Sequence, residues 1–228
     1  MKLYHHLTQC SFLCRVNRFI ALCLVDHVET TVHVKNTGRL RELLTPGARC
    51  WLEMSTNPAR KTAYDLVAVE KDGRIINIDS QAPNLIAREW VASGGWAEGL
   101  ACVRSEYVHG DSRFDLTYLN GSRRGLIEVK GVTLFDEKGM ACFPDAPTSR
   151  GAKHLQGLMQ AAQEGMECGV CFVIMREDAV GLIPNDRTDP AFSAALREAA
   201  DKGVRIIAAC CRVTADSAEI VRTAPIFL

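Results

Sequence analysis

Residues 113–130 have the sequence RFDLTYLNGSRRGLIEVK, in which two apolar runs flank an Asn-Gly dipeptide. Asn-Gly between alternating apolar residues is a strong β-hairpin signal, so this stretch predicts two antiparallel strands. With a two-residue Asn-Gly turn, Asp115 lies opposite Leu126, and Glu128 and Lys130 share the face of Leu126 because strand side chains alternate. Asp115 and Glu128 are then diagonal neighbours, about 7–8 Å apart between their backbones.

Two carboxylates and an ammonium on one face of a hairpin have the composition of a divalent-cation site. Mg²⁺ or Mn²⁺ takes oxygen ligands and is held by one or two carboxylates with several waters. We therefore expect Asp115, Glu128 and the Val129 carbonyl as metal ligands. Lys130 is the predicted catalytic ammonium, which orients the attacking water or stabilises charge on phosphorus. Glu89, on the preceding predicted helix, is an auxiliary catalytic candidate. The alternative is that this E-x-K pattern marks a solvated strand face.

The bulk properties indicate a cytoplasmic protein without a membrane span. The chain has 228 residues, 47% of them apolar, which is enough for one large domain or two ordinary ones. No apolar run reaches the roughly 18 residues of a spanning helix, and the N-terminus lacks the order of a secretory signal. The ten cysteines are expected to be reduced thiols. Cys168-x-x-Cys171 with Cys210 and Cys211 lacks the second C-x-x-C of a zinc site, so buried thiols on neighbouring strands are favoured.

The first eighty residues are rich in turn signals and poor in helix signals. Five short strands predict a small β-barrel, for which an oligonucleotide-binding (OB) barrel is the leading candidate among several small barrels. The strands are expected at residues 19–25, 30–34, 48–54, 63–70 and 74–78.

The pattern changes near residue 81, which predicts domains at 1–80 and 81–228 in an α+β protein. Asn84 is the expected cap of a helix that ends at Gly94, and antiparallel strands followed by strand–helix–strand units predict a mixed sheet covered by helices. Later helices are expected at 148–164 and 190–202, and strands at 101–108, 113–119, 125–134, 170–175 and 204–210.

This order of elements resembles the PD-(D/E)xK nuclease superfamily, which has an Asp on its second strand and an E-x-K on its third. More narrowly, the chain resembles the sugar fermentation stimulation protein family, with motifs at 36–38, 112–115, 128–134, 143–148, 150–155 and 184–186. The resemblance implies an OB barrel, a nuclease-like domain, DNA binding and a described role in regulating sugar use, especially maltose. Asp79-Ser80 stands where this family pattern leads us to expect Asn-Thr, which leaves the linker conformation open.

Basic residues outside the hairpin are the candidates for contacts with a phosphate backbone. Residues 1–80 contain 11 Lys and Arg against 8 Asp and Glu, whereas the remainder contains 16 against 19. Basic barrel loops track phosphates in many nucleic-acid-binding proteins, although isolated basic residues often serve solubility alone. The candidates are Arg15, Arg18, Lys35, Asn36, Arg39, Arg60, Lys61, Arg113, Arg150 and Lys153, with Arg41 nearby in the first cluster.

The sequence supports three functional hypotheses. The first is a metal-dependent phosphodiesterase that acts on DNA, single- or double-stranded. The second is a DNA-binding regulator with a nuclease-like fold that no longer cleaves, and the third is an interaction scaffold with incidental acids. His154 is weighed both as a general base and as a structural histidine, and the oligomeric state is left open.

Overall fold

The computed structural model describes residues 1–228, which divide into two compact units. The first contains Met1–Ala82 and Arg212–Glu219, and the second contains Pro83–Cys211 and Ile220–Leu228. The sequence prediction assigned every residue after 80 to the second domain. The structure instead groups residues 212–219 with the first unit, where the backbone amides of Leu3 and Tyr4 donate to the carbonyl of Asp216.

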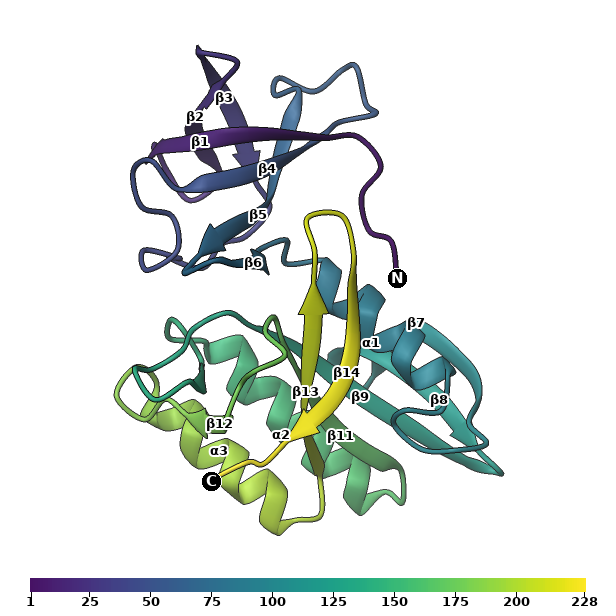
Figure 1. Cartoon of the computed structure of the whole chain (residues 1–228). Coiled ribbons are helices and arrows are strands. Elements are labelled where there is room, and N and C mark those ends of the chain that lie inside the picture. The colour runs from purple at the N-terminus through teal and green to yellow at the C-terminus, as the bar shows by residue number, and fades with distance from the viewer. The chain divides into compact units, whose positions relative to one another are not determined.

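The first unit is a closed five-stranded barrel with OB topology (Figure 1). Its strand order is β3-β2-β1-β4-β5, and a parallel β3–β5 pairing closes it, while β6 extends the sheet beyond β5. The predicted fold class is confirmed, but the first strand was missed and β6 was counted in its place. The strands are β1 (Leu7–Arg15), β2 (Ile20–Val25), β3 (Val28–Val34), β4 (Arg49–Met54), β5 (Tyr64–Lys71) and β6 (Arg74–Asn77).

The barrel interior is filled by alternate side chains of its strands. Cys10 and Phe12 of β1 are buried while Gln9 and Ser11 point outward, as the period of two requires. Between β3 and β4 the chain forms no regular helix. Three leucines of this segment are nevertheless buried: Leu40, Leu43 and Leu44.

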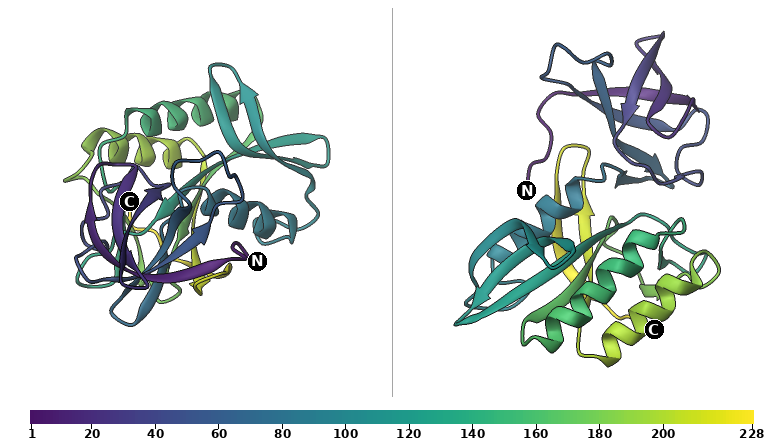
Figure 2. Two further views of the ribbon diagram at one scale, coloured as in Figure 1. Left: turned by 90° about the horizontal axis from the view of Figure 1, so that it is seen from above. Right: turned by 180° about the vertical axis from the view of Figure 1, so that it is seen from behind.

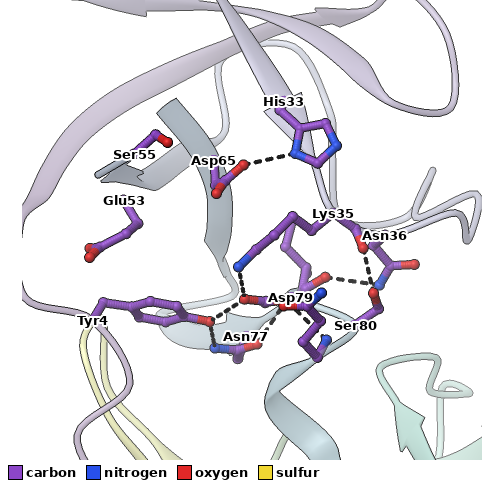
Figure 3. A network of polar contacts seen from close by, with 12 residues as sticks. Tyr4, His33, Lys35, Asn36, Glu53, Ser55, Asp65, Asn77, Asp79 and Ser80 are labelled. Atoms are coloured by element: carbon purple, nitrogen blue, oxygen red, sulfur yellow. Dashed lines mark hydrogen bonds and ion pairs between the residues drawn. The ribbon is translucent and has the colours of Figure 1, made fainter. Parts of the chain in front are cut away.

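Barrel closure depends on a buried carboxylate at the β3–β5 junction. His33 pairs with Asp65 in the strand register, and its Nδ1 lies 2.8 Å from Asp65 Oδ1. Arg60 donates to both Asp65 oxygens, at 2.9 and 2.7 Å (Figure 3 shows Asp65 with His33). Burial alone would raise the pKa of Asp65, but hydrogen bonds from Arg60 and His33 outweigh it, and the pKa is lowered.

We expect Asp65→Asn to destabilise the chain by about 1–3 kcal/mol at neutral pH, because Arg60 loses its ionic partner. A lowered folded-state pKa gives stability that is present above the ordinary carboxyl value of about 4 and is lost as pH falls. Melting temperatures measured between pH 3 and 8 should therefore converge for wild type and variant at the acid end. Asp72→Asn, at an exposed turn, is the matched control. A constant difference at all pH values would contradict this assignment.

The second unit is a six-stranded mixed sheet in the order β14-β13-β11-β9-β8-β7. β7, β8 and β9 are antiparallel, whereas β9, β11 and β13 are parallel. β10 and β12 form a separate parallel pair that the sequence prediction missed, together with β14. The strands are β7 (Ala101–His109), β8 (Ser112–Asn120), β9 (Arg123–Val132), β10 (Met140–Phe143), β11 (Glu167–Ile174), β12 (Gly181–Pro184), β13 (Arg205–Val213) and β14 (Ala218–Ala224).

Helices α2 (Ser149–Gln163) and α3 (Pro190–Asp201) lie side by side against the sheet (Figure 2, right). Their apolar faces enter one core with β9, β11 and β13, in which Leu155, Phe172 and Phe192 are among the most buried side chains. The side chains of Thr148 and Asp189 cap the two helices by accepting from the backbone amides of Gly151 and Phe192.

Helix α1 (Ala82–Ala92) begins two residues before the predicted cap Asn84. The Asp79 carbonyl accepts from the Ala82 amide and its carboxylate accepts from the Gln81 amide, so Asp79 orders the helix start. Asp79 also forms an ion pair with Lys35 at 2.5 Å, which fixes the linker whose conformation the sequence left open. Asn84 therefore lies inside the first turn, where its side chain is available for another role.

All ten cysteines are free thiols, and seven are buried. Burial raises the pKa of Cys168 and of Cys171 to about 12, so these thiols are protonated at neutral pH. No group of three or more His, Cys, Asp or Glu side chains is arranged to hold a metal ion. None of the helices has the length and apolarity that crossing a bilayer would require.

Candidate metal centre

The β8–β9 hairpin turns one residue later than the sequence predicted. Asn120 pairs with Arg123, so the loop residues are Gly121 and Ser122, and Gly121 takes a left-handed φ of 59°. The register moves by two residues, which leaves the predicted faces unchanged. The ladder ends at Leu116 and Ile127, and just beyond it the Asp115 side chain accepts from the Val129 backbone amide.

Glu128 is buried, with 2% of its surface exposed, and only one of its carboxylate oxygens is bonded. Oε1 accepts from Lys130 Nζ at 2.6 Å and contacts His154 Nδ1. Oε2 is buried without any hydrogen-bond partner. Burial would raise the Glu128 pKa, but His154 and Lys130 outweigh it and lower the pKa, so the carboxylate is ionised at neutral pH.

Asp115 is held by one donor from each neighbouring element. Asn84 of α1 donates to Oδ1 at 2.9 Å, and the Val129 backbone amide donates to Oδ2 at 2.8 Å. Burial is the main cause that raises the pKa of Asp115, and the charge of Glu128 is the second. Lys130 acts in the opposite direction.

The start of α1 is fixed against β9 beside these residues. A Cβ at Gly131 would lie 2.7 Å from the Pro83 ring, so only glycine allows the helix to approach this closely. Asn84 follows Pro83 and therefore reaches Asp115. Glu89, the predicted auxiliary residue of the same helix, is exposed, and the α1 side chain bonded to Asp115 is the amide Asn84 instead.

Lys130 thus contacts Glu128, and the charges of both act on Asp115, while a cation shared by the two carboxylates stays a prediction. For Val129, the N–H is the group that faces Asp115, and the proposed carbonyl ligand is untested. Two carboxylates without a third acidic or imidazole ligand suit a hard cation that keeps its waters. The unpartnered Glu128 Oε2 is a vacant anionic ligand in such a site.

His154 is the site residue that sequence reasoning underrated. It is buried on α2, contacts Glu128 through Nδ1, and packs its ring against Phe114 at 6.2 Å between centroids. Its position was predictable, because His154 shares the 3.6-residue spacing of the buried residues Gly151, Leu155 and Leu158. One ring nitrogen contacts Glu128 and the other accepts from Arg150 Nε, which agrees with a residue that orients Glu128.

Half of the basic candidates in the barrel already form hydrogen bonds or ion pairs within it. Arg15 donates to the carbonyls of residues 17, 18, 36, 38 and 39, and Arg60 is paired with Asp65. Lys35 pairs with Asp79, and the Asn36 side chain donates to the Ile78 carbonyl, in the network that Figure 3 shows. Arg18, Arg39 and Lys61 remain exposed.

The basic candidates of the second unit are dispersed. Arg150 lies beside the metal candidates, with Nε 3.4 Å from His154 Nε2. Lys153 lines a separate cavity of about 310 Å³ with Ser112, and Arg113 pairs loosely with Glu106 at 3.6 Å. Arg150 is linked to Glu128 through its contact with His154, and nucleic-acid binding by all three residues stays a prediction.

Comparison with known proteins identifies the family. Residues 81–217 match the family model described as "Sugar fermentation stimulation protein RE domain", and residues 13–78 match "SfsA N-terminal OB domain". The chain belongs to the sugar fermentation stimulation protein family. A family homolog from Desulfitobacterium hafniense is 47% identical over 216 residues, covering 95% of this chain and 94% of the relative.

Further relatives extend the likeness over the whole chain. The homolog from Ruminiclostridium cellulolyticum is 43% identical over 217 residues, 95% of this chain and 96% of its own. The solved structure titled "The structure of Pyrococcus Furiosus SfsA in complex with Ca2+" is 27% identical, has a TM-score of 0.90, and is covered over 100% of both chains. The two-domain fold is therefore that of the family.

Proposed function

We propose that this chain is a divalent-metal-dependent phosphodiesterase that acts on DNA, with Asp115 and Glu128 as its metal ligands. The observation that carries the proposal is the buried Glu128 Oε2, which has no hydrogen-bond partner although a buried anionic oxygen requires one. It belongs to the carboxylate whose charge raises the pKa of the neighbouring Asp115. A cation shared by both groups would satisfy the oxygen and lower that pKa.

Mg²⁺ or Mn²⁺ fits the donor set best, since both prefer carboxylate oxygens and water over thiols. When bound, such an ion polarises a phosphodiester and lowers the pKa of a water. The P. furiosus relative, which was solved in complex with Ca²⁺, is a protein of this fold with a hard divalent cation bound.

The surrounding residues supply position and charge. Asn84 and the Val129 amide orient Asp115, while His154 holds Glu128 through Oε1. Lys130 has 19% of its side chain exposed, so its ammonium can reach both Glu128 and a ligand from solution. There it would orient the attacking water or stabilise charge that develops on phosphorus.

The second candidate is a DNA-binding protein that does not cleave, such as a regulator of genes for sugar use. One observation favours it: Lys130 and His154 already balance the charge of Glu128, and both Asp115 oxygens accept hydrogen bonds. The charged cluster is therefore compatible with a folded protein that lacks a bound cation.

Incubation of supercoiled plasmid and single-stranded DNA with the full chain separates the two candidates. We expect products only with Mg²⁺ or Mn²⁺, none with EDTA, and none from the Asp115→Asn variant. Asp111→Asn, an exposed aspartate in the β7–β8 turn, is the matched control. If wild type and Asp115→Asn both shift DNA but leave it intact with either metal, the non-catalytic candidate replaces the enzyme.

A further inference from the structure

The barrel carries a cavity of about 470 Å³ between the end of β1, the β1–β2 turn and the loop before β4. Its floor is apolar, with Phe12, Leu13, Leu44 and Pro46 among the lining residues. A flat apolar group the size of a nucleobase fits the character of this lining, since ligand cavities are commonly apolar with a few polar groups at the edge.

The charged lining of this cavity is entirely basic. Four arginines contribute to it, and no aspartate or glutamate does: Arg15, Arg18, Arg39 and Arg41. Arg15 uses its guanidinium to bind backbone carbonyls of the β1–β2 turn and of residues 36–39, so it holds the two rims of the cavity together. It is therefore a structural residue here.

The other three arginines are exposed and available to an anionic ligand. Neither Arg39 nor Arg41 makes a side-chain hydrogen bond or an ion pair. Arg18 lies over the ring of Phe19, 4.7 Å from its centroid, and Phe19, which follows this lining residue in the chain but does not line the cavity, is 42% exposed. An exposed aromatic ring next to unpaired guanidinium groups is the combination that stacks a base and binds the adjoining phosphates.

The geometry points to a single-stranded DNA site: we propose that one unpaired base enters this cavity while Arg18, Arg39 and Arg41 bind the flanking phosphates. A duplex presents phosphates but keeps its base faces stacked, so it can contact the arginines but cannot place a base in the cavity. The other basic loop of the barrel contributes less, because Arg60 is committed to Asp65. This inference rests on the proposed function for its choice of DNA, but it does not require cleavage.

Fluorescence anisotropy with a labelled oligonucleotide of about twelve nucleotides tests the site. The assay uses the full chain carrying Asp115→Asn, in EDTA, so that binding is read independently of cleavage. The Arg39→Ala/Arg41→Ala double variant should bind at least about tenfold more weakly, and its salt-dependence slope should fall by about 1.4, which corresponds to two lost phosphates on a single strand. Phe19→Ala should weaken binding by about fivefold or more.

Lys71→Ala/Lys138→Ala removes the same charge from two exposed lysines outside the cavity and is the matched control. It should retain most of the affinity. An abasic oligonucleotide and a duplex of equal length should both bind more weakly than the intact single strand. Equal loss in the control, or equal affinity for the intact and abasic strands, would overturn the proposal even if the metal centre cleaves DNA. If the wild-type chain cleaves no DNA with either metal while the strand binds as expected, the proposed function is refuted and the strand-binding site is not.

Discussion

Glu128→Gln is expected to lower metal-dependent DNA cleavage by about 10³-fold. The amide keeps the size of the side chain and an oxygen acceptor, but it removes the negative charge that a hard cation requires. Loss of one ligand charge from a metal that supplies several kcal/mol of transition-state stabilisation corresponds to a rate change of this order. Initial rates on plasmid DNA, measured at saturating Mn²⁺, give the comparison directly.

Glu167→Gln provides the matched control for this variant. Glu167 is a half-buried glutamate at the start of β11, where it accepts from Asn120 and pairs with Arg123 at 2.7 Å. It makes polar contacts of the same kind in the same sheet without contacting the carboxylate pair. Melting curves should show that both variants are folded. Cleavage by Glu128→Gln within threefold of wild type would remove Glu128 from the proposed site.

Lys130→Met is expected to reduce cleavage by about 10²–10³-fold while Mn²⁺ still binds. Methionine keeps the apolar stem of the lysine and lacks the ammonium, and removal of one charged stabilising group from a transition state has this typical effect. Because Lys130 Nζ lies 2.6 Å from Glu128 Oε1, the ammonium also competes with a cation for that carboxylate. Mn²⁺ affinity measured by calorimetry should therefore be unchanged or tighter.

Lys202→Met is the control, since Lys202 pairs with Glu198 at the same 2.6 Å on the exposed surface of α3. It should cleave at the wild-type rate. If Lys130→Met loses metal affinity and cleavage in parallel, Lys130 supports the fold of the site and has no separate part in catalysis.

The candidate site was predictable from the sequence because the hairpin signal and strand periodicity are local properties. The turn was misplaced by one residue, yet the register moved by two, so each residue of the paired segment kept its predicted face. A slip of one residue would have turned each of them to the other face. The prediction therefore required only that the register shift by an even number of residues, which the alternation of apolar side chains along the hairpin enforces.

Other features depend on contacts between distant segments and were missed for that reason. Asn84 has the local signature of a helix cap, but the preceding Asp79 fulfils that function and Asn84 bonds to Asp115 instead. The first barrel strand mixes polar and apolar residues, because Cys10 and Phe12 alone carry its buried face at the centre. So weak an alternation predicts a strand only when it is already known that the barrel needs one more strand to close.

The basic residues show a further limit of sequence reasoning. Arg15 and Arg60 have the same composition signal as Arg39, but their guanidinium groups are bound to backbone carbonyls and to Asp65. Sequence identifies where positive charge is placed. Whether an internal partner already uses that charge is a property of the tertiary structure.

Anomalous diffraction from crystals soaked in MnCl₂ tests the central claim most directly. The account predicts one strong peak bonded to Glu128 Oε2 and to a carboxylate oxygen of Asp115, at roughly 2.0–2.6 Å as for hard cations and oxygen. The peak should be absent from crystals of Glu128→Gln. A fully occupied manganese site elsewhere in the chain, with none between Asp115 and Glu128, would contradict the account.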